Sequence, residues 1–321
     1  MITNTLGRRF QSRSTETLVE RARVLAAVGV AVATIAGPCA RAATIPAVNG
    51  AFTAGGDRLA YQSFGHGPIL IILAGGPGMD PAYMAPVAQA AAQAGFRAIL
   101  LSQRGVGESY VAAQSPGRLS PRGSAEDIED LRLALGADKI AILGHSFGGA
   151  VAQAYAAAHP ERVERLVLMD SVGPSLRTPH GPTDSWRQRL TPAQLKAYQQ
   201  ALAAGDLIAA ARIKFEGSFD DPTAARAFVA TLRHGWMNAD VLQTMSESFD
   251  AEYDLDLTPL DWPFPVVILS GADDWMRGYE PDLKARYPAA RTRTLEQANH
   301  FPWVEKPQET WVALRWALHA H

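Results

Sequence analysis

The sequence Gly-His-Ser-Phe-Gly-Gly at residues 144–149 follows the apolar run Ile-Ala-Ile-Leu at residues 140–143. This pattern is typical of a nucleophile elbow, in which a strand delivers a serine onto a strained turn and a helix leads the chain away. The apolar run predicts a buried strand, and the alanine-rich residues 149–158, with no breaker before Pro160, predict a helix. We therefore predict that Ser146 lies at the carboxyl edge of a sheet.

The composition is that of a globular chain with a large apolar core. Its 321 residues are 47% hydrophobic, which is enough to form one domain, or one domain with an insertion. The formal net charge of −2 and the lack of a long basic run give no argument for a nucleic-acid partner. The sequence contains no metal-ligand spacing and no nucleotide-binding loop, so it implies neither a metal nor a cofactor.

The first 42 residues have the three-part layout of an export signal. Arginines precede an apolar stretch at residues 24–36, and the small-residue pattern Ala-Arg-Ala follows at residues 40–42. We expect cleavage there, so that the mature protein is periplasmic or secreted and keeps no stable membrane anchor. An uncleaved anchor is the alternative, and the pair Arg8-Arg9 leaves open the twin-arginine route. Cys39, the single cysteine, lies in this signal, so the mature chain has no disulfide.

Strand and helix patterns alternate through residues 43–172 and resume in residues 262–321. Strands are expected at residues 58–62, 69–73, 98–101, 139–143, 166–169, 266–269 and 291–295. Helices are expected at residues 83–94, from an N-cap at Ser124 to residue 135, at residues 149–158 and at residues 307–319. This rhythm predicts an α/β fold with a mainly parallel sheet that helices cover on both faces.

Residues 173–261 interrupt the alternation. They contain four helical patterns and no convincing strand; the helices are expected at residues 193–202, 207–215, 222–232 and 240–247. A helical block inserted between two halves of a sheet is best placed over the carboxyl edge, where open parallel sheets carry their sites. We therefore predict a helical cap.

A serine nucleophile needs a base that takes its proton and a carboxylate that orients the base. The expected chain order is serine, acid, histidine, each after a strand. Of the eight histidines, His300 alone has this order and follows the last predicted strand, whereas His145 lies inside the elbow. Asp273 and Asp274 both follow the strand at residues 266–269 and compete for the role of the acid.

Acyl transfer also needs donors for the negative charge that develops on the carbonyl oxygen. The backbone N–H of Phe147, directly after the serine, is one candidate. The second is expected from the loop Ala-Gly-Gly-Pro-Gly at residues 74–78, where glycines allow the backbone to approach a substrate closely.

These motifs resemble the α/β-hydrolase superfamily across essentially the whole mature chain, and most of all the proline iminopeptidases. Residues 74–78 resemble the family motif His-Gly-Gly-Pro-Gly, which implies that Gly76 supplies the second oxyanion donor. Residues 102–109, Ser-Gln-Arg-Gly-Val-Gly-Glu-Ser, resemble its Asp-Gln-Arg motif. Residues 271–274 match the Gly-x-x-Asp acid loop, which favours Asp274, and residues 300–302 resemble the histidine loop. The resemblance implies the α/β-hydrolase fold.

Two residues depart from the family pattern. Ala74 stands where the family has histidine, and Ser102 stands where it has aspartate. Family aminopeptidases hold the free amine of the substrate with acidic residues from the cap. Residues 213–217 loosely resemble such a segment, which implies Glu216 as a substrate-binding residue, with no clear second acid.

The sequence thus predicts a serine hydrolase with the triad Ser146, Asp274 and His300, acting through an acyl-enzyme on a small molecule or short peptide. The resemblance implies release of an N-terminal residue, such as proline. A carboxylesterase or lactonase with the same triad is the alternative, and a ligand-binding receptor that keeps the fold is a third possibility. The serine in the elbow disfavours the aspartate-based chemistry of epoxide and haloalkane hydrolases.

Overall fold

The computed structural model describes residues 44–109, 116–177, 180–255 and 262–320. The predicted export signal, residues 1–42, lies outside the described residues. Thr44–His321 form one compact unit. Within the described ranges, no helix has the length and apolar character needed to cross a membrane.

An eight-stranded sheet forms the centre of this unit, with the strand order β1-β2-β4-β3-β5-β6-β7-β8. Every neighbouring pair from β4 to β8 is parallel, whereas β2 is antiparallel to both β1 and β4. This arrangement confirms the mainly parallel sheet expected from the sequence. The strands are β1 Val48–Ala54, β2 Asp57–Phe64, β3 Ile69–Leu73, β4 Arg97–Ser102, β5 Ile140–His145, β6 Val163–Met169, β7 Val266–Gly271 and β8 Arg291–Leu295.

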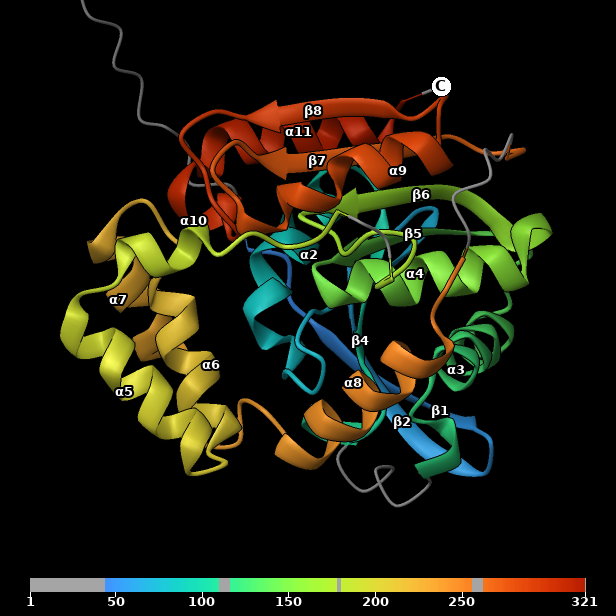
Figure 1. Ribbon diagram of the computed structural model, residues 1–321. Coiled ribbons are helices and arrows are strands. Elements are labelled where there is room, and N and C mark those ends of the chain that lie inside the picture. The colour runs from blue at the N-terminus through green and yellow to red at the C-terminus, as the bar shows by residue number, and fades with distance from the viewer. Residues whose placement is uncertain (1–43, 110–115, 178–179, 256–261, 321) are drawn as a thin grey trace, which may run out of the picture. The chain divides into compact units, whose positions relative to one another are not determined.

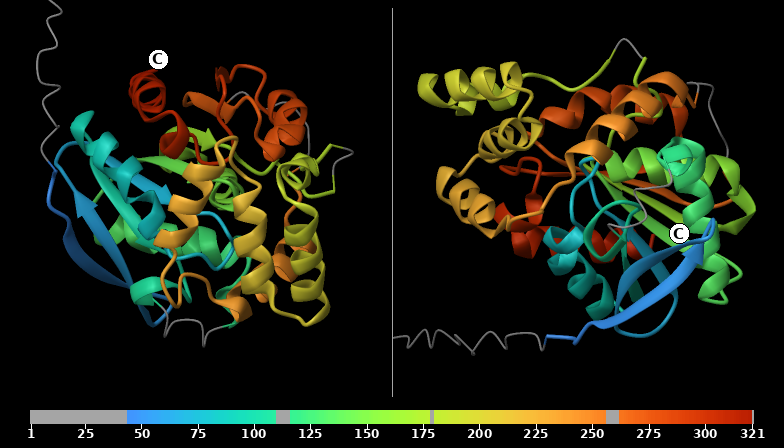
Figure 2. Two further views of the ribbon diagram at one scale, coloured as in Figure 1. Left: turned by 90° about the vertical axis from the view of Figure 1, so that its left-hand side faces the viewer. Right: turned by 90° about the horizontal axis from the view of Figure 1, so that it is seen from below.

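Helices cover both faces of the sheet (Figures 1 and 2). On one face lie α3 Pro121–Ala134, α4 Phe147–Ala158 and α9 Glu280–Arg286; on the other lie α2 Ala85–Gln93 and α11 Pro307–Leu318. Successive side chains of a strand point to opposite faces, so Ile71 joins the first apolar core and Ile72 joins the second. Burial on both sides explains why the central strands are continuous apolar runs.

Four helices lie between β6 and β7 in the chain, beyond the carboxyl ends of the strands. The arrowheads of β7 and β8 in Figure 1 point to the side of the molecule on which the first three of these helices lie. They are α5 Pro192–Ala203, α6 Leu207–Glu216, α7 Pro222–Thr231 and α8 Ala239–Glu252. No strand occurs in the described residues between β6 and β7. We call these four helices the cap. That the cap domain begins at residue 173 and ends at residue 261 stays a prediction.

Shorter elements connect these parts of the chain. The 3₁₀ turns are η1 Pro81–Met84, η3 Pro116–Arg118, η4 Pro160–Arg162, η5 Ser185–Arg189 and η6 Trp275–Tyr279, and a short helix, α10, spans Pro302–Glu305.

Two local expectations were wrong. Helix α3 begins at Pro121, and its N-cap is Ser120 rather than Ser124; the Ser120 hydroxyl accepts a hydrogen bond from the N–H of Gly123 at 3.1 Å. Proline favours the first position of a helix, where its missing N–H has no partner to lose. Strand β1 was not expected from the sequence, because it is an edge strand whose burial alternates only weakly along the chain.

Candidate active site

Ser146 stands on the strained turn between β5 and α4. Its φ of 55° and ψ of −123° are a backbone conformation that residues other than glycine rarely adopt. The flanking glycines are required by space, because a Cβ at Gly144 would lie 2.3 Å from the carbonyl oxygen of Gly148. A Cβ at Gly148 would in turn lie 2.4 Å from the carbonyl oxygen of Leu73. The turn holds the Ser146 hydroxyl at the carboxyl edge of the sheet.

The structure brings the predicted serine, histidine and acid into one hydrogen-bonded row. His300 Nε2 lies 3.0 Å from Ser146 Oγ, and His300 Nδ1 lies 3.0 Å from Asp274 Oδ1. All three side chains are buried, with residue exposures of 7% or less. Asp273, the competing acid, is exposed on the surface beside the row. The geometry matches what nucleophilic catalysis by a serine requires, with Asp274 as the orienting carboxylate.

A second carboxyl group, Asp170, lies behind Asp274. It follows β6, and its Oδ1 accepts a hydrogen bond from the N–H of Gly271 at 2.7 Å. Burial, together with the charge of Asp274, raises the pKa of Asp170 well above its usual range. Oδ2 of Asp170 and Oδ2 of Asp274 are both buried. Among the described residues, no N–H or O–H group donates a hydrogen bond to either oxygen. A proton on Asp170 that is shared with Asp274 would satisfy both oxygens, and the raised pKa of Asp170 is consistent with it.

The glycine loop at residues 74–78 lies against Ser146. A Cβ at Gly75 would come within 2.8 Å of Ser146 Cβ, and Gly76 has a φ of +125°, so both positions need glycine. Gly76 lines the same cavity as Ser146, and Phe147 is the first residue of α4. The first N–H groups of a helix have no partner within the helix. The oxyanion role of Gly76 and Phe147 stays a prediction that this placement fits.

Hydrogen bonds through Tyr83 and His145 connect this loop to the other two. The N–H of Gly75 donates to the Tyr83 hydroxyl at 2.7 Å, and that hydroxyl lies 2.8 Å from His145 Nδ1. His145 Nε2 lies 2.9 Å from the carbonyl oxygen of His300. Because a carbonyl only accepts, Nε2 carries the proton and Tyr83 donates to Nδ1. Burial lowers the pKa of His145 well below its usual value, which agrees with this neutral tautomer.

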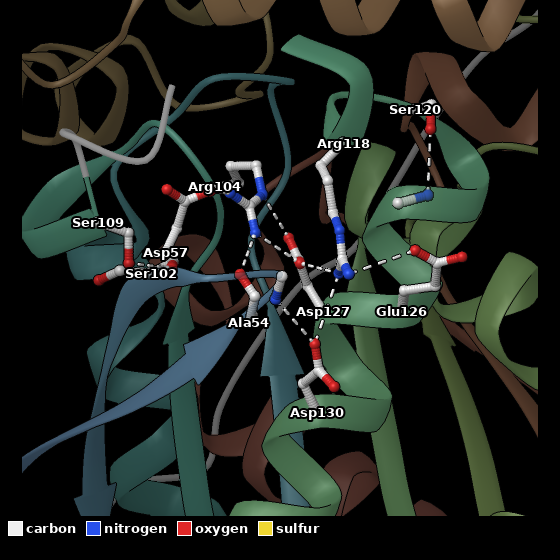
Figure 3. A network of polar contacts seen from close by, with 12 residues as sticks. Ala54, Asp57, Ser102, Arg104, Ser109, Arg118, Ser120, Glu126, Asp127 and Asp130 are labelled. Carbon is white, nitrogen blue, oxygen red and sulfur yellow. Dashed lines mark hydrogen bonds and ion pairs between the residues drawn. The ribbon is translucent and has the colours of Figure 1, made fainter. Parts of the chain in front are cut away.

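The Gln-Arg motif braces the glycine loop from the other side. Gln103 Nε2 donates to the carbonyl oxygen of Ala74 at 2.8 Å. The next residue, Arg104, binds Asp127 of α3 through Nε and Nη2, both at 2.8 Å, and also contacts Asp57 (Figure 3). Such a bidentate, buried ion pair fixes the direction of the guanidinium plane. The motif therefore positions the glycine loop. Neither Gln103 nor Arg104 lines the cavity that contains Ser146.

A cavity of about 260 Å³ opens beside Ser146 and His300 toward the cap. Most of its lining is apolar or aromatic; the cap contributes Tyr198, Leu202, Leu207, Ala210, Ala211, Phe215 and Leu242. Lys214 is the only lysine or arginine among the described lining residues, which include no aspartate or glutamate. Within the described part of the chain, no cluster of three or more histidine, cysteine, aspartate or glutamate residues is placed to hold a metal ion.

Comparison with known proteins identifies the family. A family model described as alpha/beta hydrolase fold matches residues 68–307. The chain belongs to the α/β-hydrolase family. The match confirms the fold and the family resemblance found in the sequence, and the chain is a hydrolase of this family.

The curated relatives of this α/β hydrolase include both an esterase and a peptidase. It is 30% identical over 259 residues to the pimeloyl-acyl-carrier-protein methyl ester esterase of Aeromonas hydrophila. The matched region covers 78% of this chain and 95% of the relative. It is 25% identical over 279 residues to the proline iminopeptidase of Lactobacillus helveticus. The matched region covers 77% of this chain and 88% of the relative.

Solved structures are similar in fold. The proline iminopeptidase of Mycobacterium smegmatis has a TM-score of 0.64 and 22% identity, covering 85% of this chain and 98% of that chain. The 2-hydroxy-6-oxo-6-phenylhexa-2,4-dienoate hydrolase of a Rhodococcus species has a TM-score of 0.69 and 20% identity, covering 86% of this chain and 100% of that chain. At these identities the likeness shows the α/β-hydrolase fold.

One predicted site residue of this α/β hydrolase lies elsewhere. Glu216 is not among the residues that line the cavity, and its carboxylate accepts a hydrogen bond from Gln194 of α5. Lys214, two residues earlier on α6, faces the cavity instead. Successive residues of a helix turn by about 100°, so positions two apart point to nearly opposite sides. The prediction that Glu216 binds a substrate amine is not supported by this placement.

Four residues at the site were not predicted from the sequence: Tyr83, His145, Asp170 and Lys214. His145 is part of the elbow motif itself, and its position directly before the nucleophile was the available signal. Asp170 follows an apolar strand, as the other site residues do. Tyr83 and Lys214 lie in helical turns, and no pattern in the chain separates them from ordinary surface residues.

Proposed function

We propose that this α/β hydrolase is a serine carboxylesterase that acts on small esters or lactones through an acyl-enzyme. His300 takes the proton of Ser146 as Oγ attacks the ester carbonyl carbon. The N–H groups of Gly76 and Phe147 donate to the resulting oxyanion. His300 then protonates the departing alcohol, and a water molecule, deprotonated by His300, releases the acid and restores Ser146.

The lining of the cavity favours an ester over a peptide with a free N-terminus. The amine of such a peptide is positively charged near neutral pH and needs a carboxylate partner in a partly dry pocket. A pair at 4 Å gains about 4 kcal/mol at an effective dielectric constant of 20, before desolvation is subtracted. The described lining residues offer no such carboxylate, and Lys214 would repel the amine. This is the observation on which the choice of an esterase rests.

Parallel turnover assays test the proposal. The purified protein is given p-nitrophenyl butanoate and L-proline p-nitroanilide, with Ser146→Ala as the control. We expect the ester to be hydrolysed in a Ser146-dependent way and the anilide to be cleaved much more slowly or not at all. Faster cleavage of the anilide would support the iminopeptidase alternative. Absence of Ser146-dependent turnover of either substrate would favour a binding protein that keeps the fold.

We further propose that residues 1–42 direct export and that the enzyme works in the periplasm or outside the cell. The arginine-rich start, the apolar stretch and the Ala-Arg-Ala site at residues 40–42 support this. N-terminal sequencing of the protein from separated cell fractions tests it. A mature chain that begins near residue 43 in the periplasm or medium is expected, and an intact N-terminus in the cytoplasm would contradict it.

A further inference from the structure

Lys214 places a positive charge beside the catalytic base. It lies in α6 and lines the cavity that contains Ser146. Its ammonium lies 3.7 Å from the ring centre of Trp275, and that ring lies 4.9 Å, centre to centre, from the His300 imidazole. One indole therefore separates the cation from the group that takes the serine proton.

No carboxylate among the described residues forms an ion pair with the Lys214 ammonium. Its contacts are aromatic: besides Trp275, the ring centre of Trp186 lies 5.6 Å away. Burial lowers the pKa of Lys214 to about 8; nearby Arg187 acts in the same direction, and the charges of Asp184 and Asp274 oppose it. A half-buried ammonium on an aromatic ring keeps unused hydrogen-bond capacity, which an anionic ligand can fill.

Arg187 adds to the positive potential on this side of the cavity. Its guanidinium lies 4.6 Å from the ring centre of Trp186 and 5.4 Å from that of Tyr198, a cavity residue. Asp184 forms an ion pair with Arg187 at the surface. The charge that faces the cavity itself therefore comes from Lys214.

We propose that Lys214 binds a carboxylate carried by the substrate, so that the preferred esters of this enzyme are half-esters of dicarboxylic acids. This inference rests on the proposed esterase function. The apolar lining accommodates the methylene chain between the two ends, and the volume of the cavity restricts it to a small molecule. The scissile carbonyl lies at Ser146 and the free carboxylate at Lys214.

Two chromogenic esters that differ in a single group test the proposal. p-Nitrophenyl hexanoate ends in a methyl group, and the mono-p-nitrophenyl ester of adipic acid has a carboxylate in its place. We expect kcat/KM to favour the adipate half-ester by about tenfold or more, because a hydrogen bond to a charged group is worth that much. This comparison uses the unmodified protein, so it does not depend on whether a variant folds.

Variants assign the preference to one residue. Lys214→Met should remove the preference, whereas Lys214→Arg, which keeps the charge, should retain most of it. Lys196→Met is the matched control, since it removes the same charge from an exposed position on the neighbouring helix α5. A preference that survives Lys214→Met, or a wild-type enzyme that prefers the hexanoate, would overturn the proposal.

The pH dependence provides a second readout. The preference for the adipate half-ester should decline above about pH 8, because kcat/KM follows the ionisation of the free enzyme and Lys214 then loses its charge. Any pH effect that is common to the two esters cancels in the ratio. With Lys214→Arg the decline should disappear. If neither ester is hydrolysed with Ser146 intact, the esterase function fails; if both are hydrolysed equally well, only the role of Lys214 fails.

Discussion

His145 Nε2 lies 2.9 Å from the carbonyl oxygen of His300, so the residue before Ser146 holds the loop that carries His300. The same imidazole bonds Tyr83, whose hydroxyl accepts from Gly75 in the glycine loop. The two side chains thus join three separate loops at the site. Neither side chain forms a hydrogen bond with Ser146 Oγ or with a ring nitrogen of His300, and we regard both as positioning residues.

Tyr83→Phe removes the hydroxyl that joins the glycine loop to His145. We expect kcat to fall by roughly tenfold, with KM changed little, because the distances around the oxyanion shift while the cavity wall remains. The free energy of unfolding should fall by about 1–3 kcal/mol, as two buried groups lose a partner. Steady-state kinetics and urea unfolding measure both effects.

Tyr61→Phe is the control. Tyr61 lies on β2 and packs against the first apolar core, on the opposite face of the sheet from Tyr83, so kcat should be unchanged. A loss of stability without any change in kcat would show that Tyr83 is structural only.

His145 makes stability depend on pH in the weakly acidic range. Its folded-state pKa is depressed by burial, so the stability it contributes is complete above the unfolded pKa of about 6.5 and is lost as the pH falls below that value. The slope from this one group is at most about 1.4 kcal/mol per pH unit. His145→Gln keeps one donor and one acceptor and should flatten the slope between pH 6.5 and 5.

Urea unfolding at several pH values measures this slope. His66→Gln, which makes the same replacement at an exposed position, is the matched control. An unchanged slope in His145→Gln would contradict a neutral His145 in the folded protein.

Asp170→Asn should retain activity within a few-fold and should stabilise the protein near pH 8. The raised pKa of Asp170 contributes stability that is complete below the unfolded pKa of about 4 and is lost as the pH rises toward the folded value. Asparagine donates to Asp274 and accepts from Gly271 without needing a proton from solution. Asp170→Leu leaves both partners unsatisfied and should cost about 1–3 kcal/mol.

Stability curves from pH 5 to 9 and kcat for both variants test this arrangement. If Asp170→Asn lowers stability and kcat as much as Asp170→Leu does, the two carboxyl groups do not share a proton.

Asp274→Asn should lower kcat by roughly 10³–10⁴-fold, because an amide no longer holds the tautomer of His300 that accepts the serine proton. Asp273→Asn changes the same chemistry at an exposed position and should leave kcat within about twofold. Burst kinetics with an aryl ester separate acylation from deacylation in both variants. Equal losses in the two variants would mean that the assignment of the acid is wrong.

Patterns that depend on burial were predictable from the sequence. The strand expected at residues 69–73 has the same bounds as β3, because a strand with two buried faces must be apolar throughout. The order serine, acid, histidine identified Ser146, Asp274 and His300 as candidates, since each follows a strand at the same edge. The edge strand β1 was not predicted, because one of its faces meets solvent and the burial of its residues alternates only weakly along the strand.

The direction of a side chain on a cap helix was beyond the sequence. Lys214 and Glu216 lie in one short helix, and only the packing of α6 against α5 and α7 decides which of them meets the cavity. A periodicity argument gives the relative angle between two positions but not the absolute rotation of the helix. The opposite charges of these two residues make that rotation decisive for the substrate.

The order of elements along the chain also has a consequence for biosynthesis. Ser146 is made before the cap, whereas Asp274 and His300 are made after it, on loops that follow β7 and β8. A nascent chain that has completed the elbow therefore has a serine without its base. Only when the last two strands add to β6 does the hydroxyl lie beside His300, so the proposed triad is incomplete until the final segment has left the ribosome and docked.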